Sequence, residues 1–195
     1  MLRLPPRMDR FSLGIAVLFA AGACLASLVW LPPVAALSTA ILAFAMILIT
    51  WTDLREFRIP DAVSFPAIAV GAVANTLVFH GADWHAGLAE SAIGAGLGGG
   101  AFYLLRAAYY LFRGVEGLGL GDVKLAAVAG AWLGYEPLAM LVLVAAVAAL
   151  AAVLIQNLYS TATHFDRGVA IPFGGFLAPA ILIFWLWRLA EFSKA

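Results

Sequence analysis

Two aspartates combine a chemically active side chain with an unusual place in the sequence. Asp53 stands at the end of one long apolar segment, in the run WTDLR, and Asp122 stands at the start of another, in the run GLGDVK. A carboxylate at the edge of a membrane-spanning segment is costly, so such residues are functional candidates. Asp53 and Asp122 are therefore the predicted catalytic residues.

A pair of carboxyl groups can hydrolyse a peptide bond if helix packing brings the two groups together. One carboxylate takes a proton from water, while the other, as a carboxylic acid, donates a hydrogen bond to the carbonyl oxygen of the substrate. Two neighbouring carboxyls cannot both ionise cheaply, so they share one proton and hold both roles. Each aspartate also has a basic residue two positions later, so spacing alone leaves open that both are ordinary interfacial residues.

The expected helix ends predict a difference between the two carboxyls. Asp122 is expected at a helix N-terminus, where the dipole favours negative charge, and Asp53 near a helix C-terminus, where it does not. We therefore expect Asp122 to be ionised at rest and Asp53 to be protonated. Gly119 and Gly121 lack Cβ atoms, which allows a sharp bend before Asp122 and the close approach of an extended substrate.

The composition indicates a membrane protein. Of the 195 residues, 65% are hydrophobic and 11% are charged, whereas a soluble domain averages roughly 25% charged residues. The lipid bilayer is therefore the expected surrounding. The net charge is zero, which gives no electrostatic basis for a nucleic-acid partner. The single cysteine, Cys24, excludes an internal disulfide and a cysteine-based zinc site, and we expect no cofactor or metal.

Apolar segments of about 20 residues, the length that a bilayer core requires, recur along the chain. Seven are predicted, at residues 11–31, 34–51, 62–79, 86–112, 123–134, 137–159 and 171–189. The fifth is short for a crossing, and prolines stand at several of the breaks, where they stop or start helices. We expect an all-α fold, a polytopic membrane helical bundle of about seven transmembrane helices, forming one integral-membrane domain over residues 1–195.

Positive charge predicts the orientation of this bundle. If the N-terminus is cytoplasmic, nine of the 11 basic residues fall at cytoplasmic ends or loops: Arg3, Arg7, Arg10, Arg55, Arg58, Arg106, Arg113, Lys124 and Arg167. Only Arg188 and Lys194 fall outside. This asymmetry is what the positive-inside rule expects. The same orientation puts the loops that carry Asp53 and Asp122 on one side, facing the cytoplasm.

A glycine cluster in the fourth segment has two competing interpretations. Gly94, Gly96 and Gly99 match the nucleotide-binding pattern G-x-G-x-x-G, but that pattern needs a preceding strand and a soluble βαβ unit. The cluster also contains two small-xxx-small pairs, Gly94 with Gly98 and Gly96 with Gly100, which let helices approach closely in lipid. We predict close helix packing at both pairs.

Three sequence blocks together resemble the type IV prepilin peptidases, a family of membrane aspartic proteases with a GxGD motif. The blocks are DLREFRIPD from Asp53, GLGLGDVKL from Gly117 with GAWLG soon after it, and IPFGGFLA from Ile171. They occur in order at the expected span edges, and the resemblance runs from about residue 35 to the end. It implies that Asp53 and Asp122 are the catalytic aspartates. It also implies supporting roles near them for Gly119, Gly121, Lys124, Pro60, Pro172, Phe173 and Gly174.

The resemblance implies an aspartic endopeptidase that removes the basic leader preceding the hydrophobic helix of a prepilin or pseudopilin. The cut would lie at the cytoplasmic face of the bacterial inner membrane, with Glu56, Asp61 and Glu116 as candidates for binding the leader. Larger members add an N-terminal domain with paired cysteines that binds zinc and methylates the new pilin N-terminus. With its one cysteine and 195 residues, this chain resembles the short, peptidase-only members of Flp (tight-adherence) pilus systems and is expected to lack that domain.

Other classes of protein fit the sequence less well. Intramembrane serine proteases place a nucleophile in a G-x-S-G setting and helical metalloproteases use H-E-x-x-H, and neither pattern is present. Presenilin-like proteases share the GxGD motif but not the I-P-D and I-P-F-G blocks. The alternative without enzyme activity is a small membrane transporter or a pilus-assembly scaffold. Transporters place ionisable residues near mid-membrane, where these spans carry almost none.

Overall fold

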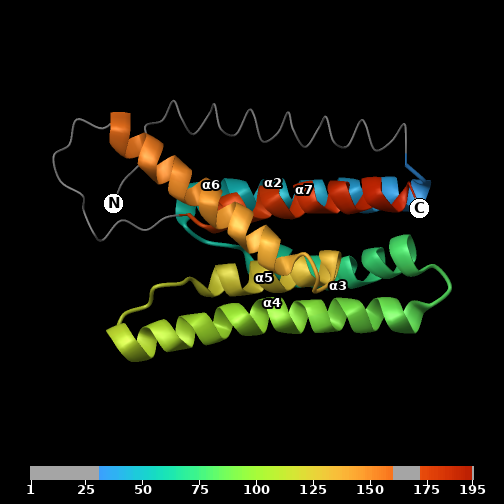
Figure 1. The fold of residues 1–195 in the computed structure, drawn as a ribbon, viewed down its shortest axis with the longest axis horizontal. Coiled ribbons are helices and arrows are strands. Elements are labelled where there is room, and N and C mark those ends of the chain that lie inside the picture. Colours follow the sequence, from blue (N-terminus) through green and yellow to red (C-terminus); the bar gives the residue numbers. More distant parts are fainter. Residues whose placement is uncertain (1–30, 160–171, 195) are drawn as a thin grey trace.

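The structure, a computed structural model, describes residues 31–159 and 172–194 (Figure 1). The described residues form helices and no strand, which confirms the all-α prediction for this part of the chain. In chain order the elements are α2 (Pro33–Glu56), α3 (Asp61–Asn75), the π-helical turn η1 (Thr76–His80), α4 (Trp84–Arg113), α5 (Leu120–Leu133), α6 (Leu138–Tyr159) and α7 (Gly174–Phe192).

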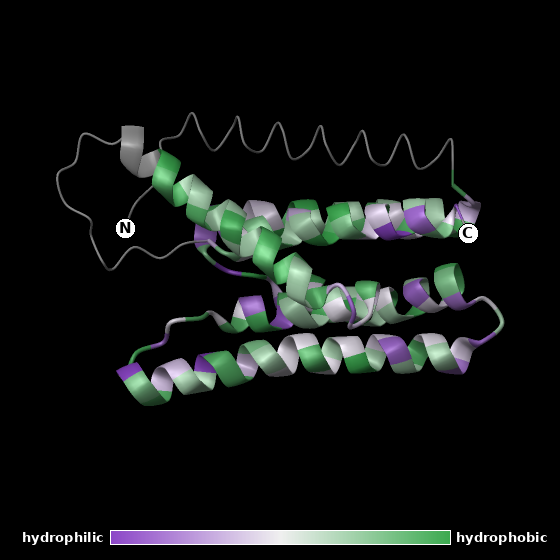
Figure 2. Ribbon diagram, in the orientation of Figure 1, coloured by the Kyte–Doolittle hydropathy of each residue, from purple (hydrophilic) through white to green (hydrophobic). Residues whose placement is uncertain are grey.

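Several of the helices are suited to cross a bilayer, as expected of a multi-pass membrane protein. Five segments have the length and composition for it, and apolar residues dominate them in Figure 2. The short helix α5, with 14 residues, is not among them. The expected span at residues 11–31, with Cys24, lies outside the described residues except for Leu31. The predicted count of seven spans is therefore not confirmed. The five are Pro33–Glu56, Asp61–His80, Trp84–Arg113, Leu138–Ile155 and Gly174–Phe192.

Helix α5 lies inside the bundle, and this explains its length. Its neighbours include α3, α4 and α7, and α4 packs against it more extensively than any other helix. Eight of its 14 residues are buried, including every residue from Val128 to Leu133. Figure 1 shows α2 and α7 together in one layer, α3, α4 and α5 in another, and α6 crossing obliquely. A helix enclosed by longer helices need not reach both membrane surfaces.

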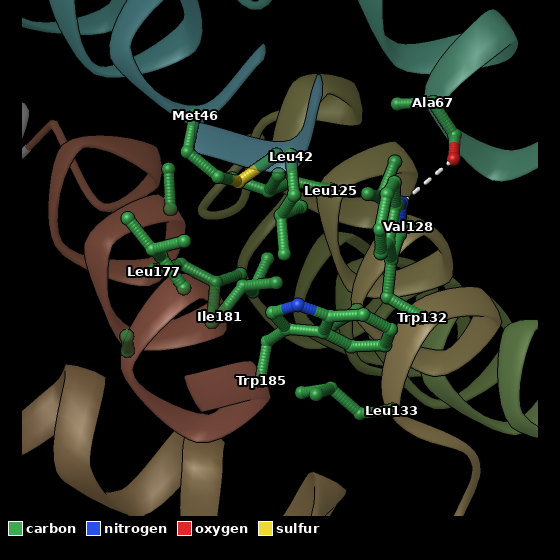
Figure 3. Packing of buried hydrophobic residues seen from close by; sticks show 14 of the residues in the cluster. Leu42, Met46, Ala67, Leu125, Val128, Trp132, Leu133, Leu177, Ile181 and Trp185 are labelled. Atoms are coloured by element: carbon green, nitrogen blue, oxygen red, sulfur yellow. Dashed lines mark hydrogen bonds between the residues drawn. The ribbon is translucent and has the colours of Figure 1, made fainter. Parts of the chain in front are cut away.

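Two buried tryptophans fix four helices relative to one another (Figure 3). The rings of Trp132 in α5 and Trp185 in α7 meet edge to face, with centroids 5.1 Å apart. Trp132 donates its Nε1 hydrogen to the carbonyl oxygen of Ala67 in α3 at 2.8 Å. Trp185 donates to Oγ1 of Thr39 in α2 at 2.9 Å. Because buried indole N–H groups need partners, these bonds set the relative positions of α2, α3, α5 and α7.

The glycine cluster of α4 packs against α5 through one of its two predicted pairs. A Cβ atom on Gly94 would lie 2.3 Å from the carbonyl oxygen of Gly130, and one on Gly98 would lie 2.4 Å from another α5 carbonyl. These two backbones touch only because side chains are absent. Among the described residues, none has an atom within 4 Å of a Cβ placed on Gly96 or Gly100. The prediction of close packing is confirmed for the first pair and wrong for the second, which lies on another face of α4.

The described basic residues divide between the two ends of the bundle. One group lies where α2 and α4 end and α5 begins: Arg55, Arg58, Arg106, Arg113 and Lys124. Arg188 and Lys194 lie at the other end, in the last turns of α7 and just beyond it. This division agrees with the charge separation on which the predicted orientation rests. The direction of the bundle in the membrane stays a prediction.

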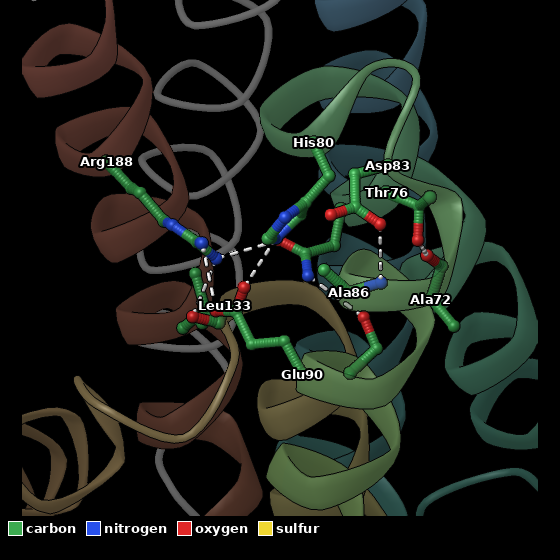
Figure 4. A network of polar contacts seen from close by, with 10 residues as sticks. Ala72, Thr76, His80, Asp83, Ala86, Glu90, Leu133 and Arg188 are labelled. Carbon is green, nitrogen blue, oxygen red and sulfur yellow. Dashed lines mark hydrogen bonds and ion pairs between the residues drawn. The ribbon is translucent and has the colours of Figure 1, made fainter.

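A polar network joins α3, η1, α4, α5 and α7 at the end of the bundle that carries Arg188 (Figure 4). The Arg188 guanidinium donates to Oδ1 of Asn75 at 2.8 Å, to the carbonyl oxygen of Leu133 at 2.8 Å and to Oε1 of Glu90 at 3.0 Å. The second carboxylate oxygen of Glu90 lies 2.6 Å from Nε2 of His80. Both oxygens of Glu90 thus have a side-chain partner.

Candidate active site

The two predicted catalytic aspartates lie at the same end of the bundle, opposite the polar network. Asp53 belongs to the last turn of α2, and Asp122 is the third residue of α5. Helix α7 begins at this end with Gly174, at the left of the view in Figure 1. Asp53 is near enough to Asp122 for its charge to affect the pKa of Asp122. The bundle therefore brings together two carboxyls that are far apart in the sequence.

Asp53 is buried and is held by the backbone of α7. Its side chain is only 6% exposed. Its Oδ2 atom accepts a hydrogen bond of 2.7 Å from the N–H of Gly175. Gly175 is the second residue of α7, and N–H groups in the first turn of a helix have no partner four residues back. The start of α7 thus supplies a donor to a carboxylate on α2.

Asp122 is held by its own helix and by α7. It occupies the third position of α5, from which a side chain can reach back to the N–H of the residue that caps the helix, here Gly119. Burial, and after it the negative charge of Asp53, raise the pKa of Asp122 to about 6. The amides of Gly119 and Gly174 favour the ionised form and so act in the opposite direction.

Two consecutive amides at the start of α7 therefore serve the two carboxyls, Gly174 toward Asp122 and Gly175 toward Asp53. There is no room for a side chain at Gly174, because a Cβ atom there would lie 3.0 Å from Oδ2 of Asp53 and 2.7 Å from Cδ1 of Ile59. A helix N-terminus attracts negative charge through its dipole and its unpaired N–H groups. The arrangement is suited to carry shared negative charge.

The position of α7 weakens the helix-dipole argument for which of the two carboxyls is protonated. The sequence argument counted only the helix to which each aspartate belongs. In the folded chain the positive end of α7 lies against Asp53 as well as Asp122. The helix dipoles alone therefore do not separate the two groups. Which one is protonated at rest stays a prediction.

Ile59 is a site residue that the sequence reasoning did not select. It is buried between the two glycine-rich segments, since a Cβ atom on Gly121 would lie 3.0 Å from its own Cβ, and one on Gly174 would also meet it. Ile59 thus sets the spacing between the start of α5 and the start of α7. Its place in the IPD block was the available signal, although an apolar side chain has no chemistry to draw attention.

The predicted supporting residues lie at the starts of three helices around the aspartates. Pro60 caps α3, and its carbonyl oxygen accepts hydrogen bonds from the first turn of that helix. Pro172 and Phe173 form the non-helical entry to α7, and the Phe173 ring lies 6.1 Å from that of Phe102 in α4. Gly119 caps α5 with an extended backbone, φ −69° and ψ 144°. The structure thus gives each of them a place beside a helix start.

The charged residues near the site are mostly paired with one another. Lys124 forms an ion pair with Asp61 and so points to the start of α3. Glu116 pairs with Arg106 at 2.5 Å. Three carboxylates were expected to meet a basic leader. Glu116 and Asp61 take part in these two ion pairs, whereas Glu56 takes part in neither and is exposed. A basic substrate would compete with Lys124 and Arg106 for the other two.

The site offers carboxylates and backbone amides rather than a set of metal ligands. Within residues 31–159 and 172–194, no group of three or more His, Cys, Asp or Glu side chains could hold a metal ion. The chemistry available from these residues is proton transfer by two carboxyls. The absence of a cofactor stays a prediction.

Comparisons with known proteins identify the family. The profile of the type IV leader peptidase family matches residues 40–154. Three similar proteins are each named prepilin leader peptidase/N-methyltransferase. The first, from Burkholderia pseudomallei (strain 1026b), is 35% identical over 149 residues, 75% of this chain and 45% of the relative. The others are from Pectobacterium carotovorum subsp. carotovorum, with 33% identity over 153 residues (78% and 52%), and Neisseria gonorrhoeae, with 32% over 137 residues (70% and 46%).

This chain spans about half the length of these relatives. No solved structure matches it. The matched residues include both aspartates, the IPD block and the GLGLGDVKL block. The chain belongs to the type IV leader peptidase family.

Proposed function

We propose that this protein is an aspartic endopeptidase that removes the leader peptide from prepilin-like substrates, with Asp53 and Asp122 as its catalytic pair. The observation that carries the proposal is the meeting of two carboxyls, from α2 and α5, at consecutive amides of α7. Membership of the type IV leader peptidase family and the names of the similar proteins support the same activity.

The mechanism follows from one proton shared by two carboxyls. The ionised member, which we expect to be Asp122, takes a proton from a water molecule as the water oxygen attacks the scissile carbonyl carbon. The protonated member, Asp53, donates a hydrogen bond to the carbonyl oxygen and then its proton as the tetrahedral diol forms. Collapse of the diol breaks the C–N bond as Asp122 passes its proton to the leaving amine. One diol hydroxyl returns its proton to Asp53 as the carbonyl re-forms, which restores the starting state of the pair. Burial, the largest cause, raises the pKa of Asp122 above its usual value, so this residue can both accept and return a proton.

The proposed substrate is a prepilin or pseudopilin whose basic leader precedes a hydrophobic helix. The leader would meet Glu56, Asp61 and Glu116, at the end of the bundle that carries the two aspartates. The hydrophobic helix of the substrate would lie in the bilayer. We place the site at the cytoplasmic face of the bacterial inner membrane, with the N-terminus also cytoplasmic. Reporter fusions after Ala195 would test this, since seven spans from a cytoplasmic N-terminus put the C-terminus outside. Cytoplasmic reporter activity there would contradict the predicted topology.

A cleavage assay with purified protein tests the function directly. Wild-type protein in lipid nanodiscs is mixed with a peptide that carries a basic leader, a glycine and a hydrophobic pilin helix. We expect leader removal by the wild type and a loss of at least about 10⁴-fold in kcat for Asp53→Asn and for Asp122→Asn. Asp83→Asn is the matched control, because Asp83 caps α4 at the opposite end and asparagine caps helices equally well.

Each outcome of this assay decides between classes of protein. Leader removal that persists in either catalytic variant would exclude that aspartate from the active site. Failure of the folded wild type to cut any pilin-like peptide would favour the transporter or scaffold. Loss of activity in Asp83→Asn as well would point to general damage to the fold, which thermal unfolding of each variant would detect.

A further inference from the structure

The peptide group between Leu118 and Gly119 lies between a cation and a catalytic candidate. Its carbonyl oxygen accepts a hydrogen bond of 2.5 Å from Nη1 of Arg106. Its nitrogen belongs to Gly119, which lies against the carboxylate of Asp122, because a Cβ atom on Gly119 would be 3.3 Å from Oδ2 of Asp122. The Gly119 amide lowers the pKa of Asp122, as a donor to that carboxylate does. A peptide group is polarised along its C=O and N–H bonds, and a cation on the oxygen strengthens donation by the N–H.

Arg106 reaches this peptide from α4, where the connection to α5 folds back along the helix. Its other terminal nitrogen, Nη2, binds Glu116 at 2.5 Å, and only 15% of its side chain is exposed. The connection is also packed closely, because a Cβ atom on Gly117 would lie 2.4 Å from the ring of Tyr109. A planar guanidinium holding two acceptors restricts the loop more than one flexible ammonium could.

We propose that Arg106 is a positioning residue for catalysis, which holds the Leu118–Gly119 peptide so that the Gly119 amide orients Asp122 and stabilises its ionised form. This inference rests on the proposed peptidase function. The cation itself does not touch Asp122, so its effect passes through one peptide bond. The role differs from that of an ordinary loop anchor, because removal of Arg106 changes the proton affinity of Asp122 as well as the position of the loop.

Other charged groups around Asp122 come from α2, α3, α5 and the connection between α4 and α5, and their effects must be separated from that of Arg106. Asp53 on α2 raises the pKa of Asp122, and Glu116 on the connection shares Arg106. On α5 and α3, Lys124 and Asp61 form an ion pair with each other. A substitution of Arg106 therefore also frees Glu116, and a variant that changes Glu116 alone is needed to separate the two effects.

The test compares Arg106→Gln, Arg106→Lys and Glu116→Gln with the wild type. For Arg106→Gln we expect kcat to fall by about 30- to 100-fold, with little change in KM, because Asp122 is misplaced. The loss of one hydrogen bond to ionised Asp122 raises its pKa, so the acid limb of the pH–kcat profile moves upward by about 0.5–1 pH unit. Arg106→Lys should recover part of both effects. Glu116→Gln keeps the Leu118 bond, so it should leave the acid limb in place, and its effect on activity is expected in KM for the basic leader.

A second readout needs no substrate. Infrared titration follows the protonated-carboxyl band that is lost in Asp122→Asn, and Arg106→Gln should move its midpoint upward, in the same direction as the acid limb. Arg113→Gln is the matched control, since it removes the same charge from the same end of α4. An unchanged Asp122 titration in folded Arg106→Gln would overturn the positioning role. Equal shifts of the Asp122 midpoint in Glu116→Gln and Arg106→Gln would also overturn it. Failure of the proposed peptidase function has a different signature, because the wild type itself would then cut no prepilin peptide.

Discussion

The two ends of the bundle hold carboxylates in opposite ways. At one end, Glu90 has a cation or a histidine at each oxygen, since Arg188 lies at 3.0 Å and His80 at 2.6 Å (Figure 4). At the other end, Asp53 and Asp122 have backbone amides as partners and one another as neighbours. Within the described part of the chain, no ion pair includes either aspartate.

This difference separates a stabilising cluster from a reactive one. A partly buried carboxylate matched by a cation keeps its charge and holds helices together, but breaking the pair is strongly destabilising. Two carboxyls without a cation repel each other and bind a proton more readily, which reduces stability and provides acid–base chemistry. We therefore expect substitutions at the first end to change stability and substitutions at the second to change activity.

Arg188→Met should have the largest effect on stability. It leaves the Glu90 charge and the oxygens of Asn75 and Leu133 without their donor, and we expect a loss of about 3–4 kcal/mol in the free energy of unfolding. Denaturant titration in mixed micelles measures this. The double variant Glu90→Gln/Arg188→Met should recover part of the loss, because no uncompensated charge remains. Reduced kcat in the protein that stays folded would show that the two ends are coupled.

Gly174→Ala should reduce catalytic activity rather than stability. The new Cβ would lie 3.0 Å from Oδ2 of Asp53, so the carboxyl must move or α7 must retreat. Displacement of a catalytic group by an ångström reduces kcat by about 100-fold, equivalent to about 2.7 kcal/mol. Gly96→Ala is the control, since no atom of the described residues lies within 4 Å of that Cβ. Full activity in Gly174→Ala would mean that the start of α7 does not fix the catalytic pair.

The sequence predicted which residues lie at this end but not how they meet. Asp53 and Asp122 stood out because acidic residues are rare at the edges of apolar segments, a rule that needs no tertiary structure. The backbone N–H groups of Gly174 and Gly175 that lie against them did not stand out, because every residue type except proline has a backbone N–H. Contacts of this kind depend on how α7 packs against α2 and α5.

Some features of the fold were predicted wrongly or incompletely because they also depend on how the helices pack. Gly96 and Gly100 have the same spacing as Gly94 and Gly98, and in a helix that is apolar on every side the sequence does not mark the face that meets a neighbour. The short segment that became α5 was predicted as a span, and this stays a prediction, because hydropathy does not distinguish lipid from protein surroundings. Arg188 was predicted as an outer charge, and its partner Glu90 on α4 could not be identified from spacing.

Asp122→Asn should make the protein more stable at neutral pH while it abolishes cleavage. Burial and the charge of Asp53 raise the pKa of Asp122 from 3.8 to about 6, so the folded state binds a proton more readily than the unfolded chain. Ionised Asp122 therefore destabilises the wild type above pH 6, and this penalty disappears as the pH falls toward 4. We expect the variant to be more stable than the wild type by about 2 kcal/mol at pH 7 and by little at pH 4.

Denaturant titrations of both proteins at several pH values measure that difference, and the comparison removes the contributions of all other titratable groups. A variant less stable than the wild type at pH 7 would mean that the amides of Gly119 and Gly174 outweigh the burial of Asp122 and its repulsion by Asp53. The site would then resemble the end that carries Glu90, with a carboxylate that stabilises the fold.

His80→Gln should have the smallest effect of the four. Glu90 would lose one partner at 2.6 Å but keep Arg188, so its charge stays compensated and the expected loss is about 1 kcal/mol. His85→Gln is the matched control, because His85 is exposed and stacks on Trp84. A loss as large as that of Arg188→Met would show that the histidine, rather than the arginine, compensates Glu90. The contrast between an end held by a charge-matched arginine and an end with two neighbouring carboxyls would then no longer hold.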